Sequence, residues 1–271
     1  MKPEWTGERL ETFLHNETAL EHLHRYSVAC SLAAGKDVLD LACGEGYGSA
    51  LLARVADKVL GIDIDSATIH AAQQRYQLPN LRFAIHNAVS IENLGESFDL
   101  IVCFETLEHI NEQEQLMKVF KKLLRPEGLL IISTPDKLNY SDRSGYQNPF
   151  HLKELYEDDF KRLITSHFSY STFYRQNFIQ GSLLQPESHN GMMQFYQGNY
   201  TAIQAVANPV HYWLAIGSDV PIKEPGTSIF QNREFLNQVT EEDVNAIKSS
   251  LSYRLGHFLL TPFKWIRNLL R

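Results

Sequence analysis

The chain has 271 residues, of which 44% are hydrophobic and 21% charged, a balance typical of a folded globular protein. Its formal net charge of -7 argues against a main role in neutralising nucleic-acid phosphates, so we predict no nucleic-acid partner. The three cysteines form no CxxC pair, which favours neither a disulfide framework nor a zinc site. A signal-peptide pattern and an apolar run of about 18 residues are both absent from the sequence, so we expect a cytoplasmic protein.

Strands and helices are predicted to alternate along the first half of the chain. Apolar spacing indicates an amphipathic helix over 17–34 that stops at Gly35. We then expect strands at 37–43, 58–65, 81–88, 98–106 and 128–134, and helices at 49–56, 66–76 and 116–124. This alternation implies right-handed crossovers between parallel strands. The predicted fold is α/β, with a doubly wound, mostly parallel, seven-stranded sheet.

The pattern loosens after Pro135. The following polar segment, rich in turn-forming residues, predicts a loop at the mouth of the active site, and a helix is expected over 153–165. Two late strands are predicted, at 171–180 and at 210–217. The segment between them, 181–209, has no assignable pattern. We expect one main domain over residues 1–220, followed by a linker and tail over 221–271.

A glycine loop follows the first predicted strand. Gly44, Gly46 and Gly48 alternate there, which allows a tight turn and the close approach of a ligand. Asp63 lies nineteen residues after Gly44, at the end of the second predicted strand, where a carboxylate can bond both hydroxyls of a ribose. A tight structural turn with a surface aspartate is the alternative. The order of strand, loop, helix, strand and acid favours a nucleoside site.

Two further acids indicate which nucleoside cofactor binds. Asp40 and Glu45 lie close to the glycine loop, where they would repel a pyrophosphate but suit a cationic amino-acid group. The six-residue GxGxxG spacing of dinucleotide sites is also absent from the loop. S-adenosylmethionine (SAM) is therefore favoured over NAD as the cofactor.

Five stretches of the sequence resemble the class I SAM-dependent methyltransferases, which have a Rossmann-like fold: VLDLACGEGYGS, VLGIDID, FAIHNA, FDLIVCFETLEHI and LLRPEGLLIISTP. The resemblance implies that the glycine loop holds the methionine part of SAM, with Asp40 supporting the loop. The other residues that it implies for the cofactor are Gly44, Gly46, Asp63, Ile64, Asn87, Ala88 and Phe104. Asn87 stands where an aspartate is more usual, and its amide can still accept a bond from the adenine amino group.

Arg25 is a further candidate, on the predicted helix before the glycine loop. A fixed guanidinium there can pair with the carboxylate of SAM. A solvated helix face is the alternative.

Two histidines are the candidate catalytic residues. His109 lies just beyond the fourth predicted strand, and related sugar O-methyltransferases resemble this chain in carrying a histidine there as the base. The alternative is a histidine that starts a helix and bonds the backbone. His151 is expected to orient the acceptor, or else to begin a helix without a ligand. We predict no metal, because Asp158 and Asp159 suit a helix N-terminus and His151-x-x-Glu154 has no further ligands nearby in sequence.

The acceptor is indicated by looser signals. TGERL, EHLHRY and NPFHLKEL resemble methyltransferases of bacterial surface-polysaccharide biosynthesis, some of them fused to glycosyltransferases. The resemblance implies O-methylation of a sugar or glycan hydroxyl and a glycosyltransferase partner. A small aromatic or quinone-like acceptor and a non-catalytic SAM-binding scaffold are the alternatives, and an NAD oxidoreductase is the least favoured.

The end of the chain forms a basic amphipathic tail over 251–271. It carries four cations and no acid, interleaved with aromatic and aliphatic residues, and Pro262 divides it into two short helical pieces. Such a tail predicts peripheral contact with the inner face of the cytoplasmic membrane. A C-terminal helix docked on the protein itself or on a partner subunit is the alternative.

Overall fold

The computed structural model describes residues 17–91, 94–178, 182–187, 195–198, 203–206, 210–231 and 248–249. The chain divides into two compact units, Met1–Gln231 and Asn232–Arg271, and every element named below belongs to the first. The tail predicted over 251–271 lies outside the described residues. Within the described part, no helix combines the length and the apolar character that crossing a membrane requires.

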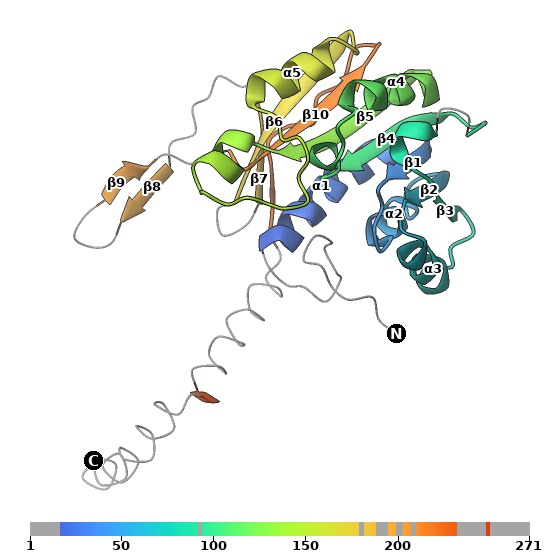
Figure 1. The fold of residues 1–271 in the computed structure, drawn as a ribbon, viewed down its shortest axis with the longest axis horizontal. Coiled ribbons are helices and arrows are strands. Elements are labelled where there is room, and N and C mark those ends of the chain that lie inside the picture. Colours follow the sequence, from blue (N-terminus) through green and yellow to red (C-terminus); the bar gives the residue numbers. More distant parts are fainter. Residues whose placement is uncertain are drawn as a thin grey trace, which may run out of the picture. The chain divides into compact units, whose positions relative to one another are not determined.

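Nine strands form one mixed sheet in the order β11-β7-β6-β10-β5-β4-β1-β2-β3 (Figure 1). Five strands run parallel: β3 (Leu81–Ile85), β2 (Lys58–Asp63), β1 (Asp37–Leu41), β4 (Phe98–Phe104) and β5 (Leu124–Pro135). The remaining neighbours pair antiparallel: β10 (Tyr212–Ser218), β6 (Tyr170–Phe178), β7 (Ser182–Pro186) and β11 (Ser228–Phe230).

The prediction of seven mostly parallel strands is therefore wrong. The sheet has nine strands, and it is mixed because four of its strands pair antiparallel. The unassigned segment 181–209 contributes β7 to the sheet, and β11 adds a further edge strand after residue 220. Strand β7 pairs with β6, which directly precedes it, and β11 pairs with β7 from earlier in the chain. With 5 and 3 residues, both strands are too short for their alternation to reveal them. The same segment also forms a separate two-stranded hairpin, β8 (Phe195–Gly198) with β9 (Ile203–Val206).

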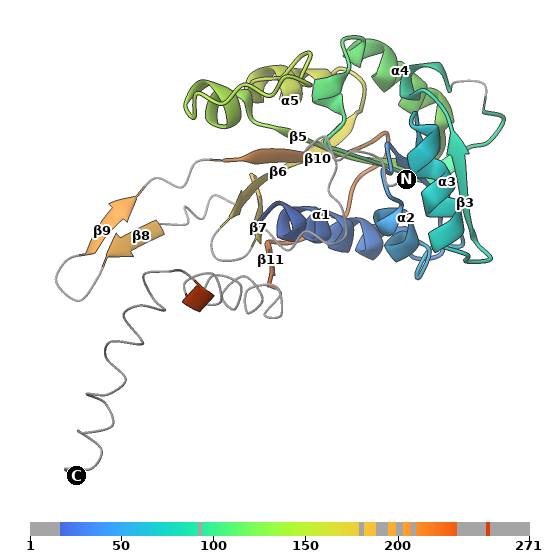
Figure 2. The same cartoon turned by 60° about the horizontal axis from the view of Figure 1, so that its bottom comes forward.

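Helices cover both faces of the sheet, as Figure 2 shows. One face carries α1 (Glu17–Ala33), α2 (Tyr47–Leu52) and α3 (Ser66–Arg75). The opposite face carries α4 (Gln113–Leu123) and α5 (Glu157–Thr165). Three short helical turns lie in the connections: η1 (Ala88–Ser90), η2 (Leu107–His109) and η3 (Leu138–Asp142). The predicted Rossmann-like arrangement of layers is confirmed.

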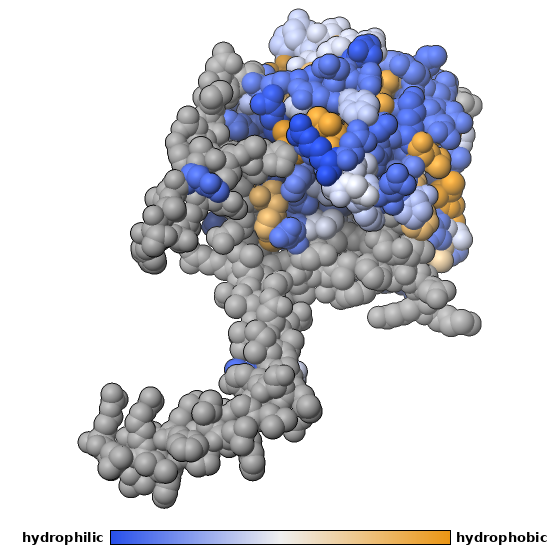
Figure 3. Space-filling model, turned by 60° about the vertical axis from the view of Figure 1, so that its left-hand side comes forward, coloured by the Kyte–Doolittle hydropathy of each residue, from blue (hydrophilic) through white to orange (hydrophobic). Residues whose placement is uncertain are grey.

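Strand β1 shows how the sequence builds these layers. Successive side chains of a strand point to opposite faces, so Val38 packs with the core under α1 and α2 while Leu39 and Leu41 pack with the core under α4 and α5. Full burial of each such side chain stabilises the fold by about 1.5–3 kcal/mol. The described surface in Figure 3 is largely hydrophilic, with small separate hydrophobic groups.

Candidate active site

A cleft of about 870 Å³ opens at the carboxyl ends of the parallel strands. Open α/β sheets bind ligands at this edge, and the volume falls within the roughly 300–1,000 Å³ typical of ligand pockets. The cleft is lined by these predicted site residues: Gly44, Asp63, Ile64, Asn87, Ala88, Phe104, His109 and His151. Three other predicted residues lie outside its lining: Arg25, Asp40 and Gly46.

The glycine loop joins β1 to α2 through left-handed backbone. Ala42, Gly44 and Gly46 have φ of 57°, 52° and 79°, and this region costs energy for any residue with a Cβ. A Cβ added to Gly44 would meet nothing within 4 Å, whereas one added to Gly46 would lie 2.7 Å from the ring of Phe83. Gly44 therefore faces open space in the cleft, and Gly46 packs against the protein.

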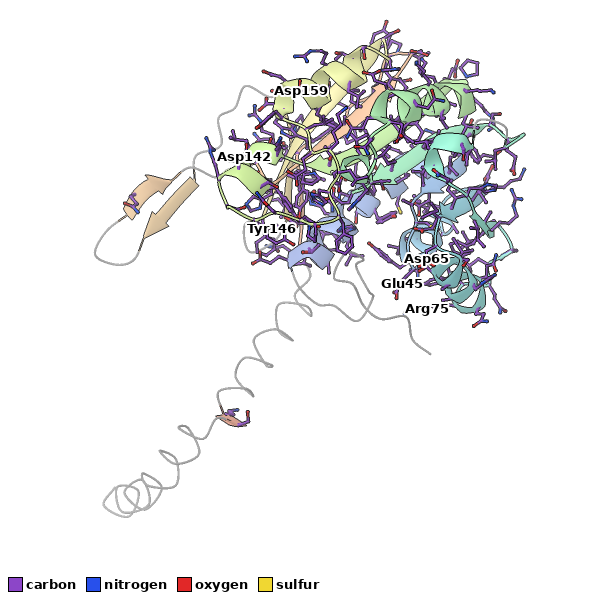
Figure 4. The ribbon with its side chains drawn as sticks, viewed as in Figure 1. Glu45, Asp65, Arg75, Asp142, Tyr146 and Asp159 are labelled. Carbon is purple, nitrogen blue, oxygen red and sulfur yellow. The ribbon has the colours of Figure 1, made fainter. Side chains whose placement is uncertain are left out.

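Asp63 connects the loop to the end of β2. One carboxylate oxygen accepts the Gly44 N–H at 3.0 Å, and the other accepts the Asp65 N–H at 2.9 Å. A carboxylate has about four acceptor positions, so ligand hydroxyls can bond the same oxygens. Ile64 beside it is 65% exposed and presents apolar surface to the cleft. Arg75 of α3 lies 3.6 Å from Glu45, and Figure 4 labels these two side chains next to each other.

Asn87 follows β3 and also lines the cleft. Its side-chain oxygen accepts the Val89 N–H at 3.1 Å and caps η1. The second lone pair of an amide oxygen can accept a ligand donor. Ala88 borders the cleft next to it, and Phe104 does so from the end of β4.

Asp40 supports the loop from the interior. Its carboxylate is 1% exposed and accepts the hydroxyls of Tyr26, at 3.1 Å, and of Ser49, at 2.6 Å. Burial is the main cause that raises the pKa of Asp40 to about 7; its two hydrogen bonds oppose the shift, and the nearby Asp63 adds to it. The fold therefore shifts Asp40 toward the protonated form relative to an exposed aspartate.

We expect Asp40→Asn to flatten the pH dependence of stability. Because the pKa of Asp40 is about 7 in the folded state and near 4 when unfolded, the folded chain holds more protons between these values. The wild type should therefore lose about 2–4 kcal/mol of unfolding free energy as pH rises from 4 to 8. An asparagine imitates the protonated acid and should lose less over the same range. Urea unfolding at several pH values measures the difference, and parallel curves for the two proteins would contradict this role.

Arg25 differs from its prediction. Its side chain is fully buried, its Nη1 donates to Gln176 Oε1 at 2.7 Å, and its guanidinium carbon lies 4.8 Å from the ring centre of Tyr212. The same nitrogen is 3.6 Å from Glu105 Oε1. Helix α1 turns this side chain toward β6 and β10, so Arg25 packs in the interior and is not among the residues that line the cleft.

Glu108, His109 and His151 meet at the other end of the cleft, which we call the histidine end. Their nearest ligand atoms all lie within 4.8 Å of one another. His109 ends η2 just after β4, and His151 lies in the loop before α5. The N–H groups of Leu152 and Lys153 donate to the Glu108 carbonyl at 2.8 and 3.0 Å, which holds the two segments together.

Each imidazole is oriented by an oxygen. His109 Nδ1 lies 3.0 Å from the carbonyl oxygen of Phe150, and His151 Nδ1 lies 2.5 Å from Glu154 Oε1. Because a carbonyl oxygen only accepts, Nδ1 of His109 carries the hydrogen and Nε2 has the lone pair. Aromatic rings surround the pair: Tyr140 stacks on His151 at 5.4 Å between ring centres.

Glu108 was missed by the sequence reasoning. Its side chain is 1% exposed and accepts the Thr134 hydroxyl at 3.0 Å. Burial, reinforced by the nearby Glu105, raises the pKa of Glu108 well above its usual range. Glu105 itself has a φ of 47°, and such strain gathers at functional sites. The Glu-x-x-Glu-His spacing of 105–109 is the sequence signal that could have identified these acids.

A family model described as a methyltransferase domain matches residues 32–201. The chain belongs to this methyltransferase family. The match covers the glycine loop, β2 and the histidine end, and it includes every predicted site residue except Arg25.

Curated relatives of this chain are also named as methyltransferases. A probable S-adenosylmethionine-dependent methyltransferase of Mycolicibacterium smegmatis is 37% identical over 55% of this chain and 59% of its own length. One from Mycobacterium tuberculosis is 33% identical over 59% of this chain and 58% of its own. A ubiquinone biosynthesis O-methyltransferase of Albidiferax ferrireducens is 35% identical over 41% of this chain and 44% of its own. The chain thus spans less than two thirds of the length of these relatives.

Solved structures agree on the fold of this methyltransferase. A SAM-dependent methyltransferase of Thermotoga maritima aligns with a TM-score of 0.52 and 15% identity, over 74% of this chain and 92% of that one. The YcgJ protein of Bacillus subtilis gives a TM-score of 0.52 and 16% identity, over 78% of this chain and all of that one. The predicted methyltransferase class and SAM as its cofactor are confirmed at the level of the family.

Proposed function

We propose that this chain is a SAM-dependent O-methyltransferase whose acceptor is a sugar hydroxyl of a glycan or glycolipid. The observation that carries the proposal is a single cleft that joins Gly44 and Asp63 at one end to His109 and His151 at the other. Methyl transfer to a hydroxyl needs a cofactor and an acceptor held in line and a group that takes the acceptor proton. Residues of this one cleft are candidates for both tasks.

The cofactor end suits SAM. Gly44 leaves open space where a Cβ would project, and the carboxylates of Glu45 and Asp63 border the same space. Negative charge there favours the ammonium and sulfonium of SAM. Gly44, Asp63, Ile64 and Asn87 would hold the cofactor, which supplies an electrophilic methyl group when bound.

His109 is the proposed base at the acceptor end. Its Nδ1–H is held by the Phe150 carbonyl, so that Nε2 can take the proton of an acceptor hydroxyl. His151 is 5.0 Å away between ring centres and would orient the same hydroxyl.

The proposal of a sugar acceptor is supported by the rings and amides of the histidine end. Tyr140 and Tyr146 form a T-shaped pair at 5.8 Å between ring centres, and Tyr146 is 52% exposed. Asn148 borders the cleft beside them. Aromatic faces can pack on the apolar face of a sugar while amides bond its hydroxyls.

An aromatic or quinone-like hydroxyl is the second candidate acceptor. The relatives named ubiquinone biosynthesis O-methyltransferase favour it. The tyrosine rings at the histidine end would pack on a planar acceptor equally well. Membrane contact through residues 251–271 and a glycosyltransferase partner remain part of the proposal only if the acceptor is a lipid-linked glycan.

Product identification tests the proposal. The full chain is incubated with methyl-labelled SAM and, in separate reactions, with fractionated cell glycans and with a panel of phenols and quinols. Mass spectrometry then locates the label, and we expect it on a glycan oxygen. Label on the phenols or quinols alone would support the second candidate. Binding of SAM without any labelled product would indicate a non-catalytic scaffold and overturn the proposed activity.

A further inference from the structure

We propose that Glu108, His109 and His151 form a binding site for one divalent transition-metal ion at the histidine end. The three side chains offer one carboxylate oxygen and two imidazole nitrogens, all within 4.8 Å of one another. Ligand atoms around a single ion at bond lengths of about 2.0–2.2 Å lie roughly 3.0–3.5 Å apart, so the three side chains would draw together when an ion binds. The two ligand segments are joined through the Glu108 carbonyl, which fixes their spacing before any ion binds.

The surroundings of the imidazoles match those of metal-ligating histidines. Such residues donate one ring N–H to a carboxylate or a backbone carbonyl, which leaves the other nitrogen to the metal. His109 has the Phe150 carbonyl as this partner, and His151 has the Glu154 carboxylate. Asn148 Nδ2 lies 3.1 Å from His151 Nε2, and a cation would replace this hydrogen bond.

The charges around Glu108 also favour a cation. Its carboxylate is buried beside Glu105, and the single buried guanidinium near them, Arg25, lies 3.6 Å from Glu105. Among the described residues, no lysine or arginine forms an ion pair with Glu108. A bound divalent ion would supply the positive partner that the Glu108 carboxylate lacks, and burial of a carboxylate without such a partner is costly.

The donor set selects the class of ion. Imidazole suits Zn²⁺, Co²⁺ and Fe²⁺, whereas Mg²⁺ and Ca²⁺ prefer oxygen ligands. Three protein ligands leave a coordination position open, as in catalytic rather than structural sites. This use of the site rests on the proposed function: an ion there would lower the pKa of the acceptor hydroxyl, whose proton would pass to water. With an ion bound, His109 Nε2 would serve as a ligand, and its role as the base applies to the site without an ion.

Cobalt titration of the full chain tests the site. After treatment with EDTA and dialysis, Co²⁺ should bind with one ion per chain and give the visible absorption of a low-symmetry cobalt complex. His151→Ala and Glu108→Gln should abolish that absorption. Glu154→Gln, which changes only the partner of His151, should weaken cobalt binding by about 10–100-fold. His70→Ala removes an exposed histidine on α3 and should leave binding unchanged.

The outcomes separate this inference from the proposed function. Thermal melts and SAM titration of each variant without metal report whether the fold and the cofactor end are intact. Cobalt binding that is absent from the wild type, or equal in His151→Ala and His70→Ala, would overturn the metal site while leaving SAM binding untouched. If Glu108→Gln does not fold, His151→Ala and Glu154→Gln decide the question.

Discussion

Asp63→Ala should weaken SAM binding by about 30–1,000-fold, or ~2–4 kcal/mol, while the chain still folds. The carboxylate would lose its bonds to the ribose hydroxyls. It would also lose the bond to the Gly44 N–H, which holds the cofactor loop against the end of β2. Calorimetric titration of SAM measures the loss directly.

Asp57→Ala is the matched control for this variant. Asp57 is an exposed aspartate just before β2, at the end of the strand opposite to Asp63, and lies outside the cleft. Its replacement should leave SAM affinity unchanged. Equal affinity in Asp63→Ala and wild type would remove Asp63 from the cofactor site.

His109→Ala should lower turnover by about 10²–10⁴-fold at saturating SAM and acceptor. The loss is expected whether Nε2 takes the proton itself or holds the ion proposed above, because both roles need this nitrogen. The affinity for SAM should change little, since His109 lies at the opposite end of the cleft from Gly44 and Asp63. Steady-state kinetics combined with SAM titration separates the two effects, and normal turnover with weakened SAM binding would contradict the assignment.

The cofactor end could be predicted from sequence because its determinants are local. Gly44, Asp63 and Asn87 each follow one strand closely, and parallel strands bring their carboxyl ends to the same edge. Periodicity therefore located both the strands and the residues that end them. The roles of these residues in binding remain predictions that the variants above test.

The histidine end could not be predicted to the same depth. The sequence predicted no metal, since the segment around His151 and Glu154 holds too few ligands. The fold adds Glu108 and His109 from a turn much earlier in the chain, through the backbone bonds to the Glu108 carbonyl. A contact of this kind depends on tertiary packing, which the spacing of residues within one segment does not report.

The burial of Arg25 and the edge strands of the sheet were not predicted from the sequence. A cation on an amphipathic helix is usually solvated, but Gln176 of β6 supplies a buried acceptor for Arg25. Strands β7 and β11 are short and pair antiparallel at the edge of the sheet, where alternation is weak. The partner of Arg25 comes from a distant part of the chain, whereas β7 directly follows β6 and is hidden by its shortness.

Titration of the wild-type chain with SAM, and separately with NAD, tests the central claim most directly. Calorimetry should detect one SAM molecule bound per chain and no heat of binding for NAD, because acidic groups border the glycine loop where a pyrophosphate would lie. Absence of SAM binding, or binding of NAD in preference to SAM, would contradict the account.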